Sequence, residues 1–143
     1  MTGDFALAVH ALVYLDHKAA TLSSEVLAEN ICTNPARVRR VMAQLKKAGL
    51  IETKEGHVGG YTFLKDPARV TLRDVCEAVE TRIVSSAWKP GSVDMDCLVA
   101  SGMAGILDNV YDELDALCLQ RLEGTTIWDI EERIFGAKAR KET

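Results

Sequence analysis

The clearest structural signal in this chain lies in residues 23–63, which read SSEVLAENICTNPARVRRVMAQLKKAGLIETKEGHVGGYTF. Two helical patterns flank the turn Cys32-Thr33-Asn34-Pro35, and the second ends at Gly49, a residue that readily adopts the left-handed conformation of a helix end. Two short β-like runs follow, joined by a glycine-rich tip. This order of elements predicts a winged helix-turn-helix, a fold that places its recognition helix in the major groove of DNA.

Periodic patterns elsewhere predict a mainly α-helical chain with a small β-hairpin wing and a long C-terminal dimerisation helix. Apolar residues recur at helical spacing over residues 4–18 and again over residues 96–122. In the long helix they step by four and three residues, as in two helices that pack side by side: Met103, Leu107, Val110, Leu114 and Leu117. At 1.5 Å per residue this helix is roughly 40 Å long, so we expect a second copy of the chain to cover it.

These patterns divide the chain into four parts. Residues 1–80 form the predicted winged helix-turn-helix domain, and residues 81–95 form a connecting loop. Residues 96–135 contain the dimerisation helix and a terminal helix, and residues 136–143 are expected to be a frayed tail. Trp128, in the terminal helix, is expected in the core.

Composition argues against several classes of function. With 143 residues, 48% hydrophobic and 27% charged, the chain has the size and balance of one globular domain. No apolar run approaches the roughly 18 residues of a membrane span, and the start lacks a secretory pattern, so we expect a cytoplasmic protein without a membrane partner. Because no Ser/His/Asp set, phosphate-cradling motif or metal-ligand spacing is present, we expect neither an enzyme nor a bound metal or cofactor.

Charge is distributed unevenly along the chain. The net charge is −4, yet residues 31–65 hold seven basic side chains and only Glu52 and Glu55 as acids, a local charge of +5. The rest of the chain therefore carries −9. A basic module on an acidic body is typical of a protein that binds nucleic acid and avoids adhesion elsewhere. A merely solvated helix face explains the same charges, and this alternative stays open here.

The predicted recognition helix supplies most of the candidate DNA contacts. Arg37 and Arg40 share one face that Gln44 extends, and arginine binds guanine bidentately as glutamine binds adenine. The candidate set comprises Thr33, Asn34, Arg37, Arg39, Arg40 and Gln44, with Lys46 and Lys47 on backbone phosphate and Lys54 and His57 on the wing. A winged helix can also dock onto proteins, so the alternative function is a dimer that binds a partner protein and no DNA.

Several segments resemble the Rrf-two family of bacterial winged-helix transcription regulators. They are residues 5–12 (FALAVHAL), 45–51 (LKKAGLI), 59–61 (GGY), 70–80 (VTLRDVCEAVE) and 122–130 (LEGTTIWDI). The resemblance spans nearly the whole chain. It implies a homodimer, joined by the long helix, that binds a near-palindromic operator in double-stranded DNA, most often as a repressor.

The chain departs from this family in two places. Iron–sulfur members carry three cysteines before the long helix, whereas residues 81–97 contain only Cys97, so we predict no iron–sulfur centre. The resemblance then points to the branch without the cluster, whose members respond to redox or metabolite signals. Several relatives also place an arginine before the wing glycine, where this chain has Glu55, so Lys54 or His57 would have to substitute for it.

Cys97 is the candidate redox sensor. It lies where the loop meets the start of the long helix, and a helix N-terminus lowers the pKa of a thiol and favours the reactive thiolate. Asp94 and Asp96 oppose that effect. An inert cysteine at a helix start is the alternative, and a small-molecule effector is the other candidate signal.

Overall fold

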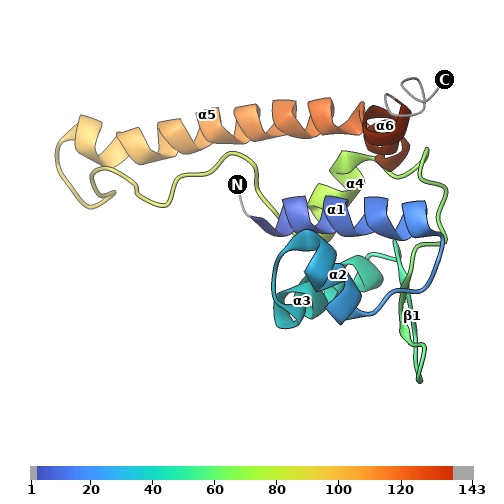
Figure 1. Cartoon of the computed structure of the whole chain (residues 1–143). Coiled ribbons are helices and arrows are strands. Elements are labelled where there is room, and N and C mark those ends of the chain that lie inside the picture. Colours follow the sequence, from blue (N-terminus) through green and yellow to red (C-terminus); the bar gives the residue numbers. More distant parts are fainter. Residues whose placement is uncertain (1–2, 137–143) are drawn as a thin grey trace.

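The computed structural model describes residues 3–136, so residues 137–143 of the predicted tail lie outside the described part. Its elements follow the predicted order (Figure 1). They are α1 (Gly3–Lys18), α2 (Ser24–Ile31), α3 (Pro35–Lys47), β1 (Glu52–Lys54), β2 (Gly60–Thr62), α4 (Leu72–Ala78), α5 (Leu98–Glu123), α6 (Ile127–Glu131) and a π-helical turn η1 (Glu132–Gly136). The predicted fold class, mainly helical with a β-hairpin wing and a long C-terminal helix, is confirmed.

Local capping fixes where the helices of the helix-turn-helix begin and end. The hydroxyl of Ser23 accepts a hydrogen bond from the Val26 backbone N–H at 3.2 Å, which caps α2. Cys32 ends α2 in the left-handed conformation, with φ 66°. Asn34 then caps α3, because its side-chain oxygen accepts from the Arg37 N–H at 2.8 Å. Side-chain caps thus set where α2 and α3 begin, and a left-handed residue sets where α2 ends.

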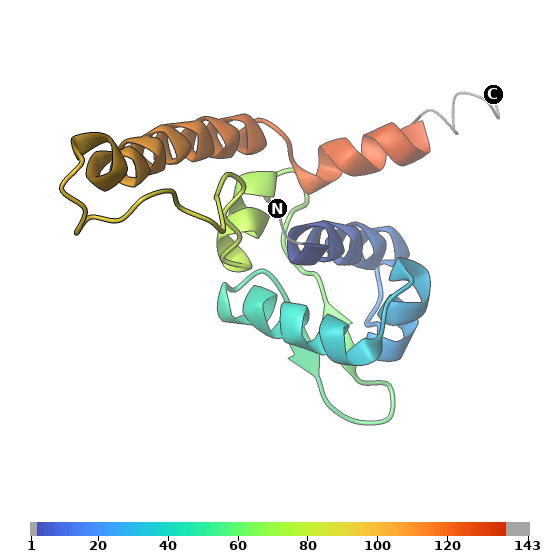
Figure 2. The same ribbon diagram turned by 90° about the vertical axis from the view of Figure 1, so that its left-hand side faces the viewer.

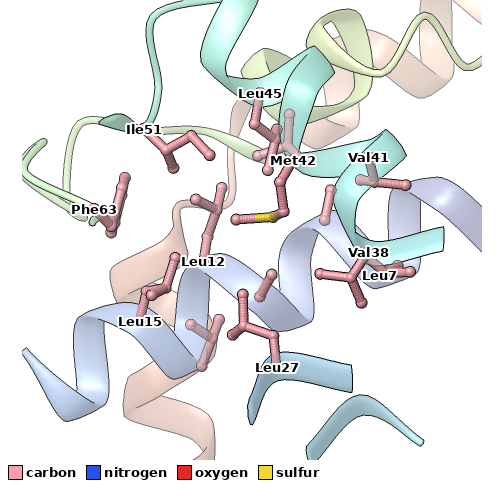
Figure 3. Packing of buried hydrophobic residues seen from close by; sticks show 14 of the residues in the cluster. Leu7, Leu12, Leu15, Leu27, Val38, Val41, Met42, Leu45, Ile51 and Phe63 are labelled. Carbon is pink, nitrogen blue, oxygen red and sulfur yellow. The ribbon is translucent and has the colours of Figure 1, made fainter. Parts of the chain in front are cut away.

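The hydrophobic core lies where α1, α2 and α3 meet, with the base of the wing closing it (Figure 3). α3 contributes four fully buried side chains, Val38, Val41, Met42 and Leu45. They pack against a face of α1 that includes Leu12 and Leu15. Each such side chain contributes about 1.5–3 kcal/mol by leaving water. One face of α3 is therefore held firmly while the other stays outside.

The wing is a short antiparallel hairpin in which Glu52 pairs with Thr62 and Lys54 with Gly60. A bridge between Leu22 and Tyr61 attaches it to the segment after α1. Gly60 has φ +153°, and a Cβ there would collide with the Leu22 carbonyl, so glycine is needed for this close approach. α3 and the wing lie on the side of the molecule away from α5 (Figures 1 and 2).

α5 extends past the rest of the chain, and none of its residues is buried (Figure 1). The segment before it runs back along the helix and is tied to it by polar contacts. Asp115 accepts hydrogen bonds from the Ile83 and Val84 N–H groups at 2.9 Å each, and Lys89 pairs with Asp108 at 2.9 Å. At 26 residues α5 is about 39 Å long.

α6 returns the chain to α1. Its first residue, Ile127, is fully buried and donates its N–H to the Val70 carbonyl at 2.9 Å. Thr126 and Asp129 form the predicted capping box. The expectation that Trp128 lies in the core is wrong, since it is 46% exposed: the short helix turns Ile127 inward and its neighbour outward. Across the described residues, no helix combines the length and apolar character of a membrane span.

Candidate nucleic-acid interface

The outer face of α3 follows from its buried face. With four side chains fully buried on one side, helical geometry places Ala36, Arg40, Ala43 and Lys47 on the opposite side, all of them exposed. Arg39 and Lys46, also exposed, flank this row. The two alanines were not among the sequence candidates. Their short side chains allow the helix to approach a groove closely, and an alanine methyl can contact the thymine methyl group. The position opposite the buried stripe was the signal that would have found them.

Two arginines of α3 share one acidic partner on α1. Arg40 Nη2 donates to both Asp4 oxygens, at 3.1 and 3.3 Å, and Arg37 donates to Asp4 Oδ1 at 3.4 Å through Nε and Nη2. Gly3 leaves room for Arg37, because a Cβ at that position would overlap its guanidinium. The first turn of α1 therefore neutralises part of the positive charge of α3.

Arg39 is paired in the same way with the start of α2. Its Nη1 donates to Ser24 Oγ at 3.2 Å and to Glu25 Oε1 at 3.5 Å. The pKa of Glu25 is lowered, first by its own backbone N–H, then by the Ser24 hydroxyl, with a further contribution from Arg39. Exposed ion pairs of this kind contribute about 0–1 kcal/mol, so phosphates or base edges can replace the carboxylates at low cost.

The remaining candidates on α3 face in different directions. Gln44 is half-buried, and its Oε1 is buried with no hydrogen-bond partner within residues 3–136, so it faces the interior. Lys46 donates from Nζ to Thr53 Oγ1 of β1 at 2.9 Å, which links the helix to the wing. Asn34 uses its oxygen as the helix cap, and Thr33 beside it is half-buried.

The wing places charges of both signs at its tip. Lys54 and His57 are exposed, as predicted for wing contacts, but so is Glu55 between them. A carboxylate at this position is repelled by phosphate, because both groups are negatively charged. The structure therefore leaves these wing contacts as a prediction.

Cys97 lies at the N-cap of α5 and is exposed. The backbone N–H groups of Ala100 and then Val99 lower the pKa of its thiol, because they favour the thiolate over the neutral form. Cys76, in contrast, is fully buried, and burial raises the pKa of that thiol. Of these two thiols, Cys97 therefore has the chemistry of a reactive cysteine.

A winged helix that turns a basic helix face to solvent is typical of one class of protein, the DNA-binding transcription regulators. Within that class, the family model described as Rrf2, iron-dependent transcriptional regulator, matches residues 1–133. YwnA of Bacillus subtilis (strain 168), whose name describes an HTH-type transcriptional regulator, is 30% identical over 132 residues, which cover 91% of this chain and 96% of YwnA. The chain belongs to the Rrf2 (Rrf-two) family of transcriptional regulators.

Solved structures share the fold over the same length. The crystal structure of a transcriptional regulator from Lactobacillus plantarum superposes with a TM-score of 0.81 at 23% identity and covers all of both chains. The crystal structure of a protein described as DNA-binding superposes with a TM-score of 0.68 at 28% identity, over 89% of this chain and 97% of the other. The winged helix and the long helix are thus found together in relatives.

The residues of this chain do not fit the iron suggested by the family description. Within residues 3–136, no three His, Cys, Asp or Glu side chains gather in a geometry that could hold a metal ion. Cys32 at the end of α2 and Cys97 at the start of α5 are exposed, whereas Cys76 on α4 is buried, which raises its pKa, and lies close enough to Cys118 on α5 for that thiol to contribute to the rise.

Proposed function

We propose that this regulator acts as a homodimeric repressor that binds a near-palindromic DNA operator. The observation that carries the proposal is α5, which buries no residue although it is 26 residues long. Met103, Val110, Leu114 and Leu117 are between 37% and 60% exposed, and Leu107 is half-buried. An apolar stripe of this length in water favours a second copy of the same helix, which gives a two-fold dimer.

In such a dimer the two α3 helices would read two half-sites. Dimeric helix-turn-helix proteins place their recognition helices about 34–36 Å apart, one turn of DNA. Arg40, with Ala36 and Ala43 beside it, would read base edges, while Lys47 would bind phosphate. Arg37 and Arg40 would first be released from Asp4, and Arg39 from Glu25. We assign DNA binding to residues 1–80 and dimerisation to residues 96–135, with residues 81–95 connecting them.

The signal that tunes DNA affinity has two candidate receivers. One is Cys97, whose exposed thiol has a lowered pKa. Mild oxidation by a peroxide is then expected to change DNA affinity in the wild type and to leave Cys97→Ser unaffected; equal responses in the two proteins would exclude this thiol. The other receiver is a small-molecule site, discussed below.

Fluorescence anisotropy tests the proposal directly. The full chain is titrated against DNA from upstream of its own gene, with random DNA as competitor. We expect competitor-resistant binding that weakens at least about tenfold between 50 and 200 mM salt, because phosphate neutralisation releases counter-ions. Binding no stronger than to random DNA across a library of candidate operators would favour the alternative, a dimer that docks onto a partner protein.

A further inference from the structure

A large apolar hollow runs along α1 and is separate from the α3 surface. This hollow, here called the α1 groove, has a volume of about 540 Å³ and follows one face of α1 from Phe5 to His17. Ile130, Ile134 and Phe135 of α6 and η1 form its opposite wall. Small-molecule sites typically have volumes of about 300–1,000 Å³.

The lining of the α1 groove is rich in aromatic rings. It contains two of the three phenylalanines, Phe5 and Phe135, two of the three histidines, His10 and His17, and Tyr14. His17 and Phe135 already stack, with ring centroids 4.0 Å apart and planes inclined by 13°. Rings placed at both ends of an apolar hollow favour a planar aromatic guest, because offset and edge-to-face ring pairs add to simple burial.

A polar pair gives the groove a means of orienting its guest. His10 Nε2 and Asn30 Oδ1 lie 2.7 Å apart at the edge of the groove. An amide oxygen only accepts, so His10 Nε2 donates in this pair and Nδ1 of the neutral imidazole is an acceptor, while the amide nitrogen of Asn30 is a donor. A hydroxyl or carbonyl on the guest would therefore have a partner there.

Phe5 connects this groove to the two surfaces of the proposed function. It also lines a second apolar hollow of about 430 Å³, together with Leu114 and Leu117 of the proposed dimer seam. The residue before it, Asp4, holds Arg37 and Arg40. A guest that shifts the first turn of α1 would thus act on the dimer seam and on the recognition helix at once.

We propose that the α1 groove binds a small planar aromatic molecule carrying one hydrogen-bonding group, and that this molecule is the effector of the regulator. The effector role rests on the proposed function, whereas the binding site does not require it. Stacking on His17 and Phe135 holds the ring, and the His10–Asn30 pair orients the polar group.

Calorimetric titration of the full chain with 2-naphthol tests the site. Its saturated counterpart, decahydro-2-naphthol, has the same carbon skeleton and hydroxyl, but its rings are not aromatic. We expect one site per chain and affinity about tenfold higher for the aromatic compound, the gain expected from ring contacts. Equal affinities, or no binding of 2-naphthol, would overturn the proposal.

Two variants locate the binding. Ala6 is exposed and lines the groove, so Ala6→Trp fills it without disturbing the core, and 2-naphthol binding should be lost. Ala20→Trp makes the same change at an exposed position just past α1 and should bind as the wild type does. Unchanged binding by Ala6→Trp would place the guest elsewhere and overturn the proposal.

A second copy of the chain is the competing occupant of the groove. In that case Ala6→Trp would weaken self-association in sedimentation velocity, and 2-naphthol would be excluded from the dimer, which contradicts the proposal. The calorimetric assay contains no DNA, so its failure leaves DNA binding intact. Failure of the anisotropy assay alone would remove the effector role and leave the site.

Discussion

α3 and α5 both face outward, but the chain supports them to very different degrees. α3 has four fully buried side chains, and its three arginines are paired with Asp4 or Glu25 of neighbouring helices. α5 has no buried residue and leaves Leu117 60% exposed. α3 is thus packed against its own chain on one face, whereas α5 leaves its apolar stripe exposed, as the proposed dimer requires. Substitutions on α3 and on α5 should therefore affect the protein in different ways.

The largest effect is expected from a charge in the apolar stripe of α5. Leu114→Glu would place a carboxylate against the second copy, where burial without a partner is costly. We expect monomers in sedimentation velocity and a loss of operator affinity of about 100-fold or more, because two linked half-site contacts become independent.

Ala116→Glu is the matched control for this substitution. Ala116 is exposed and lies about 200° around the helix from Leu114, so the same charge should leave the dimer and its DNA affinity intact. Circular dichroism would check that both variants stay helical. A dimeric Leu114→Glu protein would mean that α5 does not supply the interface.

Arg40→Ala tests the DNA contacts proposed for α3. Loss of a bidentate base contact should cost about 1–3 kcal/mol of operator binding and relax the preference for one base pair. Lys47→Ala should weaken operator and random DNA about equally and reduce the salt slope by about one. Anisotropy titrations against the operator and single-base variants separate the two. Equal losses on every sequence from Arg40→Ala would make it a phosphate contact.

The packing of α6 against α1 should make the stability of the fold depend on pH. Burial, followed by the neighbouring carboxyls of Asp16 and Glu132, raises the pKa of Glu131 to about 8, and Glu131 is only 6% exposed. The folded chain thus holds a proton that the unfolded chain releases near pH 4.5. This stabilisation is complete below the unfolded pKa and is lost as pH rises through about 8.

Glu131→Gln keeps the shape and removes the titration. Because each pKa unit corresponds to about 1.4 kcal/mol, we expect the unfolding free energy of Glu131→Gln, relative to that of the wild type, to grow by roughly 2–3 kcal/mol from about pH 6 to about pH 9. Urea unfolding at several pH values measures this. Glu52→Gln, at an exposed carboxyl on β1, is the control. Parallel pH profiles for wild type and Glu131→Gln would show that Glu131 ionises freely.

The fold could be predicted from the sequence because its decisive signals are local. Asn34 caps α3 by accepting from the N–H group three residues along the chain, and Gly49 follows the helix with φ +79°. The site depends on contacts between distant residues. Asp4 and Arg40 are 36 positions apart, and no periodic pattern in the sequence predicts their pairing. Gln44 shares a helical face with Arg37, yet it lies close enough to the buried stripe for its side chain to turn inward.

Asp4→Asn should give the smallest effect, and it tests directly how Asp4 influences DNA binding by α3. The Asp4 carboxylate competes with DNA phosphate for Arg37 and Arg40, and this substitution removes it. We expect affinity for random DNA to rise about threefold and the salt slope to steepen by roughly one unit, so that discrimination in favour of the operator falls.

Asp112→Asn is the control, because it removes an equal charge on α5, where Asp112 pairs with Arg82. It should leave random-DNA affinity nearly unchanged. In the Arg40→Ala background the effect of Asp4→Asn should shrink, since the partner it releases is gone. Weaker operator binding with unchanged random-DNA binding would instead make Asp4 a positioning residue. The sign of this one change therefore decides whether the acids of α1 restrain the recognition helix or aim it.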